Sequence, residues 1–336
     1  MEPILLLVHT ETDGTLAKPA LEALGAALSL GGELTVGLVG AEVQPAANQI
    51  SGAGAKRILG VVGEAFSQPR YSTDAAAAEA ICRAAGAAIV LAPSTSRWSR
   101  ALPGVAYRLG GRVDTHATGL ELRNGAPAVT RWFYRQRMEA VLAREQRPWM
   151  VLLDPGCFTA WSGPAGTADL ENVAVEAPQT RTIVTGVQAP KTDEQTIRPD
   201  ARLLLVAGAG WTMMQADGAI HGMEAETLIL GFLRTTKSSL GGSKSLVDAS
   251  GEGEAVLGFM THLNQIGQTG STPRHRKGLS TCCHGEEPHV VGWRFVNERR
   301  AINLDANCGW ARGKADVLYV ADAFEVMRHV NQLLGA

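Results

Sequence analysis

Cysteine is scarce in this sequence, and its spacing argues against two kinds of cysteine-based structure. The 336 residues contain five cysteines, an odd number, and no two of them form a Cys-x-x-Cys pair. A disulfide framework and a four-cysteine zinc site are therefore not expected. Cys282, Cys283 and His284 adjoin one another, but adjacent cysteines project in different directions and no second ligand pair follows. We expect no metal site, and a reducing compartment fits best.

The sequence also lacks long apolar runs and an excess of charge of one sign. No stretch approaches the ~18 to 20 apolar residues of a membrane-spanning helix. The first apolar run is interrupted at His9 and has no basic leader, which indicates a buried strand rather than a signal peptide. The formal net charge of −2 provides no general attraction to nucleic acid or to an anionic membrane. These absences predict a cytoplasmic protein without nucleic-acid binding or direct membrane insertion.

Glycine and small apolar residues are abundant instead. Hydrophobic residues make up 45% of the chain and there are 38 glycines, which is typical of α/β proteins, and the length favours two domains. Continuous apolar runs alternate with segments of helical periodicity, so we expect a parallel sheet covered on both faces. The expected strands lie within 4–10, 33–40, 56–63 and 87–94, and the expected helices within 16–32, 44–52 and 72–86.

The pattern changes twice further along the chain. Residues 126–158 alternate apolar and polar side chains, which predicts antiparallel strands that close one edge of the sheet. The following stretch is polar and rich in proline, and an apolar strand at 201–207 then begins a second α/β unit. We therefore predict an N-terminal α/β domain, a connecting segment and a C-terminal α/β domain, at 1–160, 161–200 and 201–336.

Two glycine-containing turns in the second half are candidate ligand loops. Gly208-Ala209-Gly210 follows the apolar strand, where backbone amides can meet a phosphate, but it lacks the third glycine of a dinucleotide fingerprint. In the second turn, Gly267 and Gly270 flank Thr269, whose hydroxyl is thereby offered at a defined place. Either turn alone is equally consistent with an ordinary connection. A basic cluster follows the second turn, formed by Arg274, His275, Arg276 and Lys277.

Five motifs, in order, resemble the α subunit family of electron transfer flavoproteins, and the spacing from Gly270 to Asp305 matches without a gap. This resemblance implies two α/β domains, the second Rossmann-like and binding FAD against a β subunit. Similarity extends to the first half, where 90–111 resembles the family's Ala-Pro-x-Thr segment followed by Leu-x-Pro. The motifs are SKSLVD (243–248), IGQTG (266–270), HGEEPH (284–289), NLD (303–305) and ADVLYVADAF (315–324).

The resemblance also implies a role for single residues around the flavin ring. Thr269 would form a hydrogen bond near the flavin N5, and His289 would face the pyrimidine carbonyl, where a donor stabilises negative charge on the reduced ring. Lys244 would add positive electrostatic potential at the flavin ring. As ordinary structural alternatives, Thr269 could close a turn and His289 could be a polar residue at a strand end.

Other residues would hold the rest of the cofactor. By the same resemblance, Ser243 would lie by the diphosphate, and Asn303 and Asp322 would hold the ribityl and adenosine portions. Asn303 or Asp322 could alternatively cap a helix. No catalytic residue is expected. The complete expected FAD-binding set is Ser243, Lys244, Gly267, Gln268, Thr269, Gly270, Gly285, His289, Asn303 and Asp322.

Several positions depart from the family pattern. Ala209 replaces an arginine, and Lys244 replaces another, which keeps the charge but loses the planar guanidinium. Glu286 and Glu287 replace an apolar pair and would oppose an anionic pyrophosphate. We expect the basic side chains after the second turn, Arg274, Arg276 and Lys277, to compensate.

These features favour a redox carrier subunit rather than a stand-alone enzyme. It would take electrons from a flavin-dependent dehydrogenase, pass them to a downstream acceptor and pair with a β-like subunit. The divergence favours a dedicated dehydrogenase, for methylated amines or amino acids, over a general fatty-acid oxidation carrier. The alternative is a structural subunit of the same ancestry that holds a larger oxidoreductase complex together without redox cycling.

Overall fold

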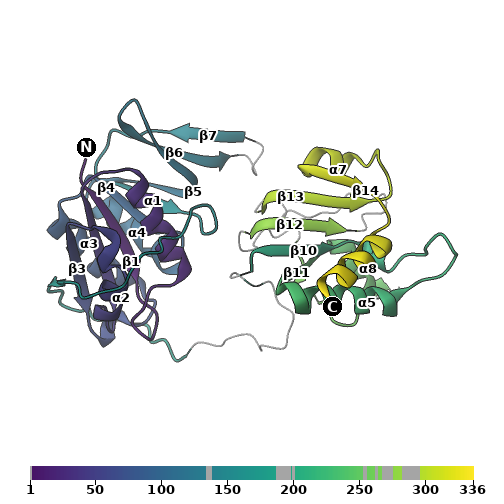
Figure 1. Cartoon of the computed structure of the whole chain (residues 1–336). Coiled ribbons are helices and arrows are strands. Elements are labelled where there is room, and N and C mark those ends of the chain that lie inside the picture. The colour runs from purple at the N-terminus through teal and green to yellow at the C-terminus, as the bar shows by residue number, and fades with distance from the viewer. Residues whose placement is uncertain are drawn as a thin grey trace. The chain divides into compact units, whose positions relative to one another are not determined.

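The protein consists of two compact units, residues 1–187 and 188–336, and the division falls inside the expected connecting segment (Figure 1). The computed structural model describes residues 2–133, 138–186, 198, 201–252, 256–261, 264–266, 275–281 and 296–336. Among these residues, no helix is long and apolar enough to cross a membrane.

The first unit is built on a nine-stranded sheet with the order β7-β6-β5-β8-β4-β1-β2-β3-β9. Its elements are β1 (Ile4–His9), α1 (Lys18–Ser29), β2 (Leu34–Gly40), α2 (Gln44–Gln49), η1 (Ser51–Ala53), β3 (Arg57–Val62), η2 (Glu64–Phe66), α3 (Tyr71–Ala85), β4 (Ile89–Pro93), α4 (Ser96–Arg108), β5 (Arg112–Arg123), β6 (Ala126–Phe133), β7 (Met138–Leu142), β8 (Trp149–Leu153) and β9 (Glu171–Asn172).

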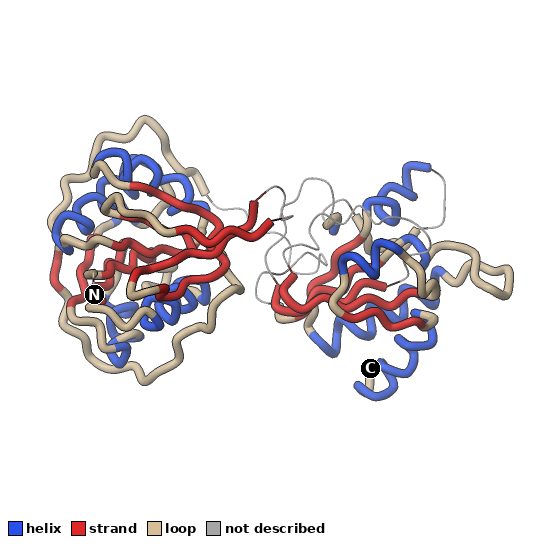
Figure 2. The backbone as a smooth tube through the Cα atoms, turned by 90° about the horizontal axis from the view of Figure 1, so that it is seen from above, coloured by secondary structure: helices blue, strands red, loops and turns tan. Residues whose placement is uncertain are grey.

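Helices cover both faces of this sheet, as the continuous apolar runs predict (Figure 2). Successive side chains of a strand point to opposite faces, so Leu6 of β1 packs with α1 and α2, whereas Leu5 and Leu7 pack with α3 and α4. All three leucines are fully buried. The expected strands and helices of the first 94 residues are thereby confirmed.

The antiparallel edge is confirmed for part of the predicted stretch. β5 pairs antiparallel with β6, and β6 with β7, at one edge of the sheet. The prediction is wrong for residues 149–153, because β8 inserts parallel between β4 and β5. Every residue of β8 is buried, which is typical of a central strand covered on both faces rather than an alternating edge strand.

Residues that follow β8 pack on the first unit. The Trp161 N–H donates to the Leu21 carbonyl at 2.9 Å, and Trp161 and Leu170 pack against the core around α1. A Cβ atom on Gly25 would lie 2.1 Å from the Thr159 carbonyl oxygen, so glycine permits this close crossing over α1. β9 then adds to the sheet beside β3. This part of the 161–200 segment is therefore attached to the first unit.

The second unit has a five-stranded, wholly parallel sheet with the order β11-β10-β12-β13-β14. This doubly wound order and the separate first sheet confirm the predicted two-domain α/β fold. The elements of the second unit are β10 (Leu203–Ala207), η3 (Ala209–Trp211), α5 (Gly222–Thr236), β11 (Ser239–Gly242), α6 (Lys244–Glu252), β12 (His275–Thr281), β13 (Val296–Asn303), α7 (Gly309–Lys314), β14 (Val317–Val320) and α8 (Ala323–Leu334).

Candidate cofactor site at the carboxyl edge of the second sheet

The strand order of the second sheet marks where a ligand is expected to bind. α5, which follows β10, packs with α8 on one face, whereas Ala311 of α7 packs in the core on the other face. The chain therefore changes direction between β10 and β12, and in such sheets ligands bind beyond the carboxyl ends of the strands at this point. Because all five strands are parallel, their carboxyl ends share one edge.

The predicted site residues that the structure describes all lie at this carboxyl edge. Ser243 and Lys244 follow β11, Asn303 is the last residue of β13, and Asp322 comes two residues after β14. The strand register agrees, since Ala207 pairs with Gly242 and Thr281. Ser243 and Asp322, which are 79 positions apart in the sequence, are thus gathered at the same end of the sheet.

Ser243 joins β11 to the first turn of α6. Its backbone N–H donates to the Ala207 carbonyl at 2.9 Å, and its Oγ accepts from the Leu246 N–H at 3.2 Å. The side chain therefore caps α6 and is almost fully buried, at 1% exposure. A hydroxyl that accepts a hydrogen bond still has its own proton to donate. Ser243 can therefore cap the helix and donate to a phosphate oxygen.

Lys244 is the first residue of α6 and carries a positive charge at this edge. Its Nζ lies 2.6 Å from Oδ2 of Asp248, one turn further along the helix. A cation is unfavourable at a helix N-terminus, and this carboxylate offsets that cost. The ion pair also reduces the positive potential that Lys244 offers to a ligand.

Asn303 and Asp322 shape the chain where it leaves β13 and enters α8. Asn303 is buried, and its Oδ1 accepts from the Asp305 N–H at 2.9 Å. Its backbone carbonyl accepts from the Ala321 N–H at 3.1 Å. Asp322 Oδ1 accepts from the Glu325 N–H at 3.0 Å, so Asp322 caps α8, one of the two roles considered from the sequence. Both residues therefore stabilise the protein itself at this edge.

The turn after β10 is held by Trp211 and by Thr281, and the sequence did not single out Thr281. The Gly208 N–H donates to the Thr281 carbonyl at 2.9 Å. The Thr281 Oγ1 accepts from the Trp211 indole N–H at 2.8 Å, and the Trp211 ring lies 4.6 Å from that of Phe324. Trp211 and Thr281 are fully buried. In the sequence, the signal for Thr281 is a hydroxyl at the end of an apolar strand. Its partner Trp211 is 70 residues away, so the sequence does not reveal the pair.

The described residues directly before position 267 lie at the same edge. Gln265 pairs with Gly242, and the Ile266 N–H donates to the Gly242 carbonyl at 3.1 Å. Gly241 permits this approach, because a Cβ atom there would lie 1.7 Å from Ile266 Cδ1. Six of the expected FAD-binding residues lie outside the described part of the chain and stay predictions: Gly267, Gln268, Thr269, Gly270, Gly285 and His289.

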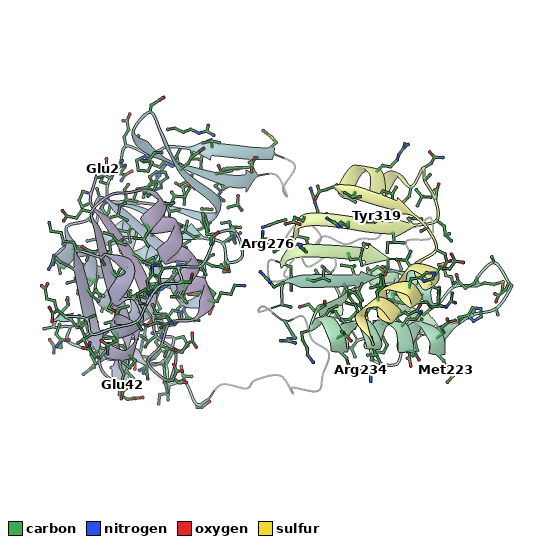
Figure 3. The ribbon with its side chains drawn as sticks, viewed as in Figure 1. Glu2, Glu42, Met223, Arg234, Arg276 and Tyr319 are labelled. Carbon is green, nitrogen blue, oxygen red and sulfur yellow. The ribbon has the colours of Figure 1, made fainter. Side chains whose placement is uncertain are left out.

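Two of the three basic residues expected to compensate at the site, Arg276 and Lys277, lie elsewhere. Lys277 pairs with Leu203, the first residue of β10, and is therefore at the amino end of the sheet. Arg276 is labelled on the side of the second unit opposite Met223 (Figure 3). Both cations lie near Glu298, at 3.6 and 4.0 Å. The predicted compensation is therefore wrong for Arg276 and Lys277, and Arg274 lies outside the described residues.

His275 differs from its basic neighbours in being fully buried. Its Nε2 lies 2.9 Å from Ser239 Oγ and 3.0 Å from the Arg198 carbonyl oxygen. These contacts hold Arg198, in the chain that leads to β10, at the amino ends of β11 and β12, away from the candidate site.

The donor set at the carboxyl edge fits a phosphate-containing cofactor. The Ser243 hydroxyl, the positive end of the α6 dipole and the Lys244 ammonium are all suited to an anion. Of the acidic groups nearby, Asp248 is paired with Lys244, and Asp322 accepts from a backbone N–H. These residues can hold a phosphate without an arginine at position 209.

Fold and site together define a two-unit α/β protein of the doubly wound class, with a ligand edge in its second unit. The family model for the electron transfer flavoprotein domain matches residues 4–178, more than half of the chain. The chain therefore belongs to the electron transfer flavoprotein domain family, which confirms the resemblance drawn from its motifs. It is also 26% identical over 324 residues to Protein FixB of Clostridium saccharobutylicum, covering 93% of this chain and 88% of that protein.

Proposed function

We propose that this chain is the α-like subunit of an electron transfer flavoprotein and binds one FAD at the carboxyl edge of its second unit. The observation that carries this proposal is the convergence of Ser243, Lys244, Asn303 and Asp322 at one end of a parallel sheet. The family match in the first unit and the similarity to FixB across both units support it.

The described residues would hold the anionic and sugar portions of the cofactor. Ser243 donates its hydroxyl proton to a diphosphate oxygen, and the positive end of the α6 dipole begins beside it. Asn303 and Asp322 present polar atoms to the ribityl and adenosine portions. Thr269 and His289 are proposed to contact the ring and to set its potential by donating hydrogen bonds. The flavin supplies the electron-transfer chemistry when it is bound.

The proposal extends to the protein's surroundings. The partner in the cytoplasm is a β-like subunit, and the electron donor is a flavin-dependent dehydrogenase acting on methylated amines or amino acids. The chain is then a carrier within an oxidoreductase system rather than a stand-alone enzyme.

Cofactor analysis of the purified heterodimer tests this function. The chain is co-expressed with its β-like subunit, and flavin absorbance is recorded before and after incubation with added FAD. We expect one FAD per α-like chain, identified by chromatography after heat release. A complex that stays colourless after incubation contradicts the proposal and leaves the structural-subunit alternative, and bound FMN in place of FAD contradicts the assignment of the adenosine contacts.

A further inference from the structure

The connection between β10 and α5 displays apolar side chains at the carboxyl edge of the second unit. Met214, Ile220 and Met223, which we call the methionine knob, are 65%, 51% and 87% exposed. The loop that carries Met214 and Ile220 projects beyond the sheet, and Met223 follows in the first turn of α5, where it is labelled at that end (Figures 1 and 3). Single exposed apolar residues are common, but three within ten residues of one another indicate a contact surface.

Internal hydrogen bonds hold the knob in one shape. The Gln215 N–H donates to the Ala219 carbonyl at 2.9 Å and the Gly218 N–H to the Gln215 carbonyl at 2.9 Å, so the loop closes on itself between Met214 and Ile220. The Gln215 side chain donates to the Gly210 and Met213 carbonyls at 2.9 and 2.8 Å. A loop backbone that is ordered before binding costs less entropy when a partner covers it.

Charged pairs surround the apolar centre. His221 Nε2 lies 2.7 Å from Asp217 Oδ2, and Arg328 donates to Glu224. The Ala219 N–H and His221 hold the pKa of Asp217 below its usual range, and the hydrogen bond from Arg328 does the same for Glu224. Both carboxylates therefore stay charged at neutral pH. An apolar centre with a polar rim is the usual anatomy of a protein–protein contact.

The size and place of the knob indicate the kind of partner. A stable interface buries about 800 Å² per partner and involves about 20 to 30 residues on each side, far more than three side chains supply. A transient partner needs less, and methionine adapts to its surface. The knob also begins directly after the Gly208–Gly210 turn of the candidate cofactor edge. A protein that exchanges electrons with a cofactor held there has to approach this edge.

We propose that the methionine knob is a docking surface for the flavin-dependent dehydrogenase that exchanges electrons with this subunit. This proposal rests on the proposed function. The β-like subunit and a second copy of the chain are the competing occupants.

The test uses the FAD-loaded heterodimer and a panel of purified flavin-dependent dehydrogenases from the source organism, each with its own substrate. The triple variant Met214→Gln, Ile220→Thr, Met223→Gln removes the apolar surface but keeps the hydrogen bonds of Gln215, Asp217 and His221. The matched control, Leu333→Gln, Leu334→Gln, Val317→Thr, alters exposed apolar residues near the opposite edge of the same unit.

With the dehydrogenase that reduces the wild-type flavin, the knob variant is expected to show a KM for the heterodimer raised roughly tenfold or more, with kcat retained. The control variant stays within about twofold of wild type. FAD content and reduction by dithionite are measured on the same samples. They show whether the heterodimer is loaded with a reducible flavin, so a failure of the docking proposal is distinguished from a failure of the proposed function.

An unchanged KM in the knob variant overturns the proposal even if the heterodimer is fully loaded with FAD. Loss of the β-like subunit or of self-association from the knob variant would instead assign the surface to one of the competing occupants. A loaded heterodimer that no dehydrogenase in the panel reduces also overturns it.

Discussion

Asp322 serves the protein as a helix cap and is proposed to serve the cofactor as well, and a conservative change separates these two roles. In the Asp322→Ser variant a hydroxyl still accepts from the Glu325 N–H, so unfolding stability stays near wild type, whereas Asp322→Ala loses about 1 kcal/mol. Both variants lose the carboxylate, so we expect FAD affinity to fall about tenfold or more in each. Thermal unfolding and FAD titration of the heterodimer check this. If the serine variant binds FAD with wild-type affinity, Asp322 caps α8 and does not bind the cofactor.

His9, at the carboxyl end of β1, is expected to make the first unit sensitive to acid. Burial, and to a lesser degree the charge of Arg97, lower the pKa of His9 from 6.5 to about 4. Between these values the unfolded chain binds the proton and the folded chain does not, so stability falls as the pH drops from 6.5 to 4. At pH 4.5 the free energy of unfolding is lower than at neutral pH by about 2 to 3 kcal/mol.

The His9→Gln variant cannot take up this proton, and its stability should change less between pH 7 and 4.5. Urea unfolding, followed by the fluorescence of the buried Trp98 and Trp149, measures the difference. The same pH dependence in variant and wild type would show that other groups cause the acid sensitivity.

Among the elements, β11 positions Gln265 and Ile266, which pair with Gly242 and directly precede residue 267. Gly241→Ala would place a Cβ atom 1.7 Å from Ile266 Cδ1, within a buried contact, and should displace the loop entrance. We expect a loss of stability of about 1 to 3 kcal/mol and reduced FAD content.

The double variant Gly241→Ala, Ile266→Ala provides the control. Ile266→Ala alone leaves a cavity and costs about 2 to 5 kcal/mol, but it also makes room for the new methyl group. The two changes together should therefore cost less than their sum, as measured by chemical unfolding. If the stability costs of the two single variants simply add in the double variant, the contact between Gly241 and Ile266 does not restrict the side chain at either position.

For the whole molecule, we propose that the first folding unit extends past residue 160. Trp161 and Leu170 pack against its core, and Arg57 pairs with Glu171 at 2.7 Å. A fragment of residues 1–180 should unfold cooperatively, and a fragment of residues 1–160 should be less stable by about 2 to 4 kcal/mol. Urea unfolding of both fragments decides this, with Trp161→Ala in the longer fragment as control. Equal stability would place the boundary at 160.

Local sequence patterns were sufficient for much of this protein. Continuous apolar runs predict β1, β2, β3 and β4 correctly, because burial on both faces depends on the residues of each strand itself. The family motifs also identified Ser243, Asn303 and Asp322, which the structure places at the carboxyl ends of β11, β13 and β14, and parallel strands bring such positions to one edge.

Tertiary structure alone decided which partners these elements find. β8 follows two antiparallel strands in sequence yet pairs between β4 and β5, and the pairing of distant strands is not encoded in local periodicity. Lys277 comes seven residues after Gly270 but lies at the opposite end of the sheet from Ser243, because a parallel connection must return to the amino end before the next strand starts. The shape of the methionine knob likewise depends on hydrogen bonds across its loop, which the order of residues does not reveal.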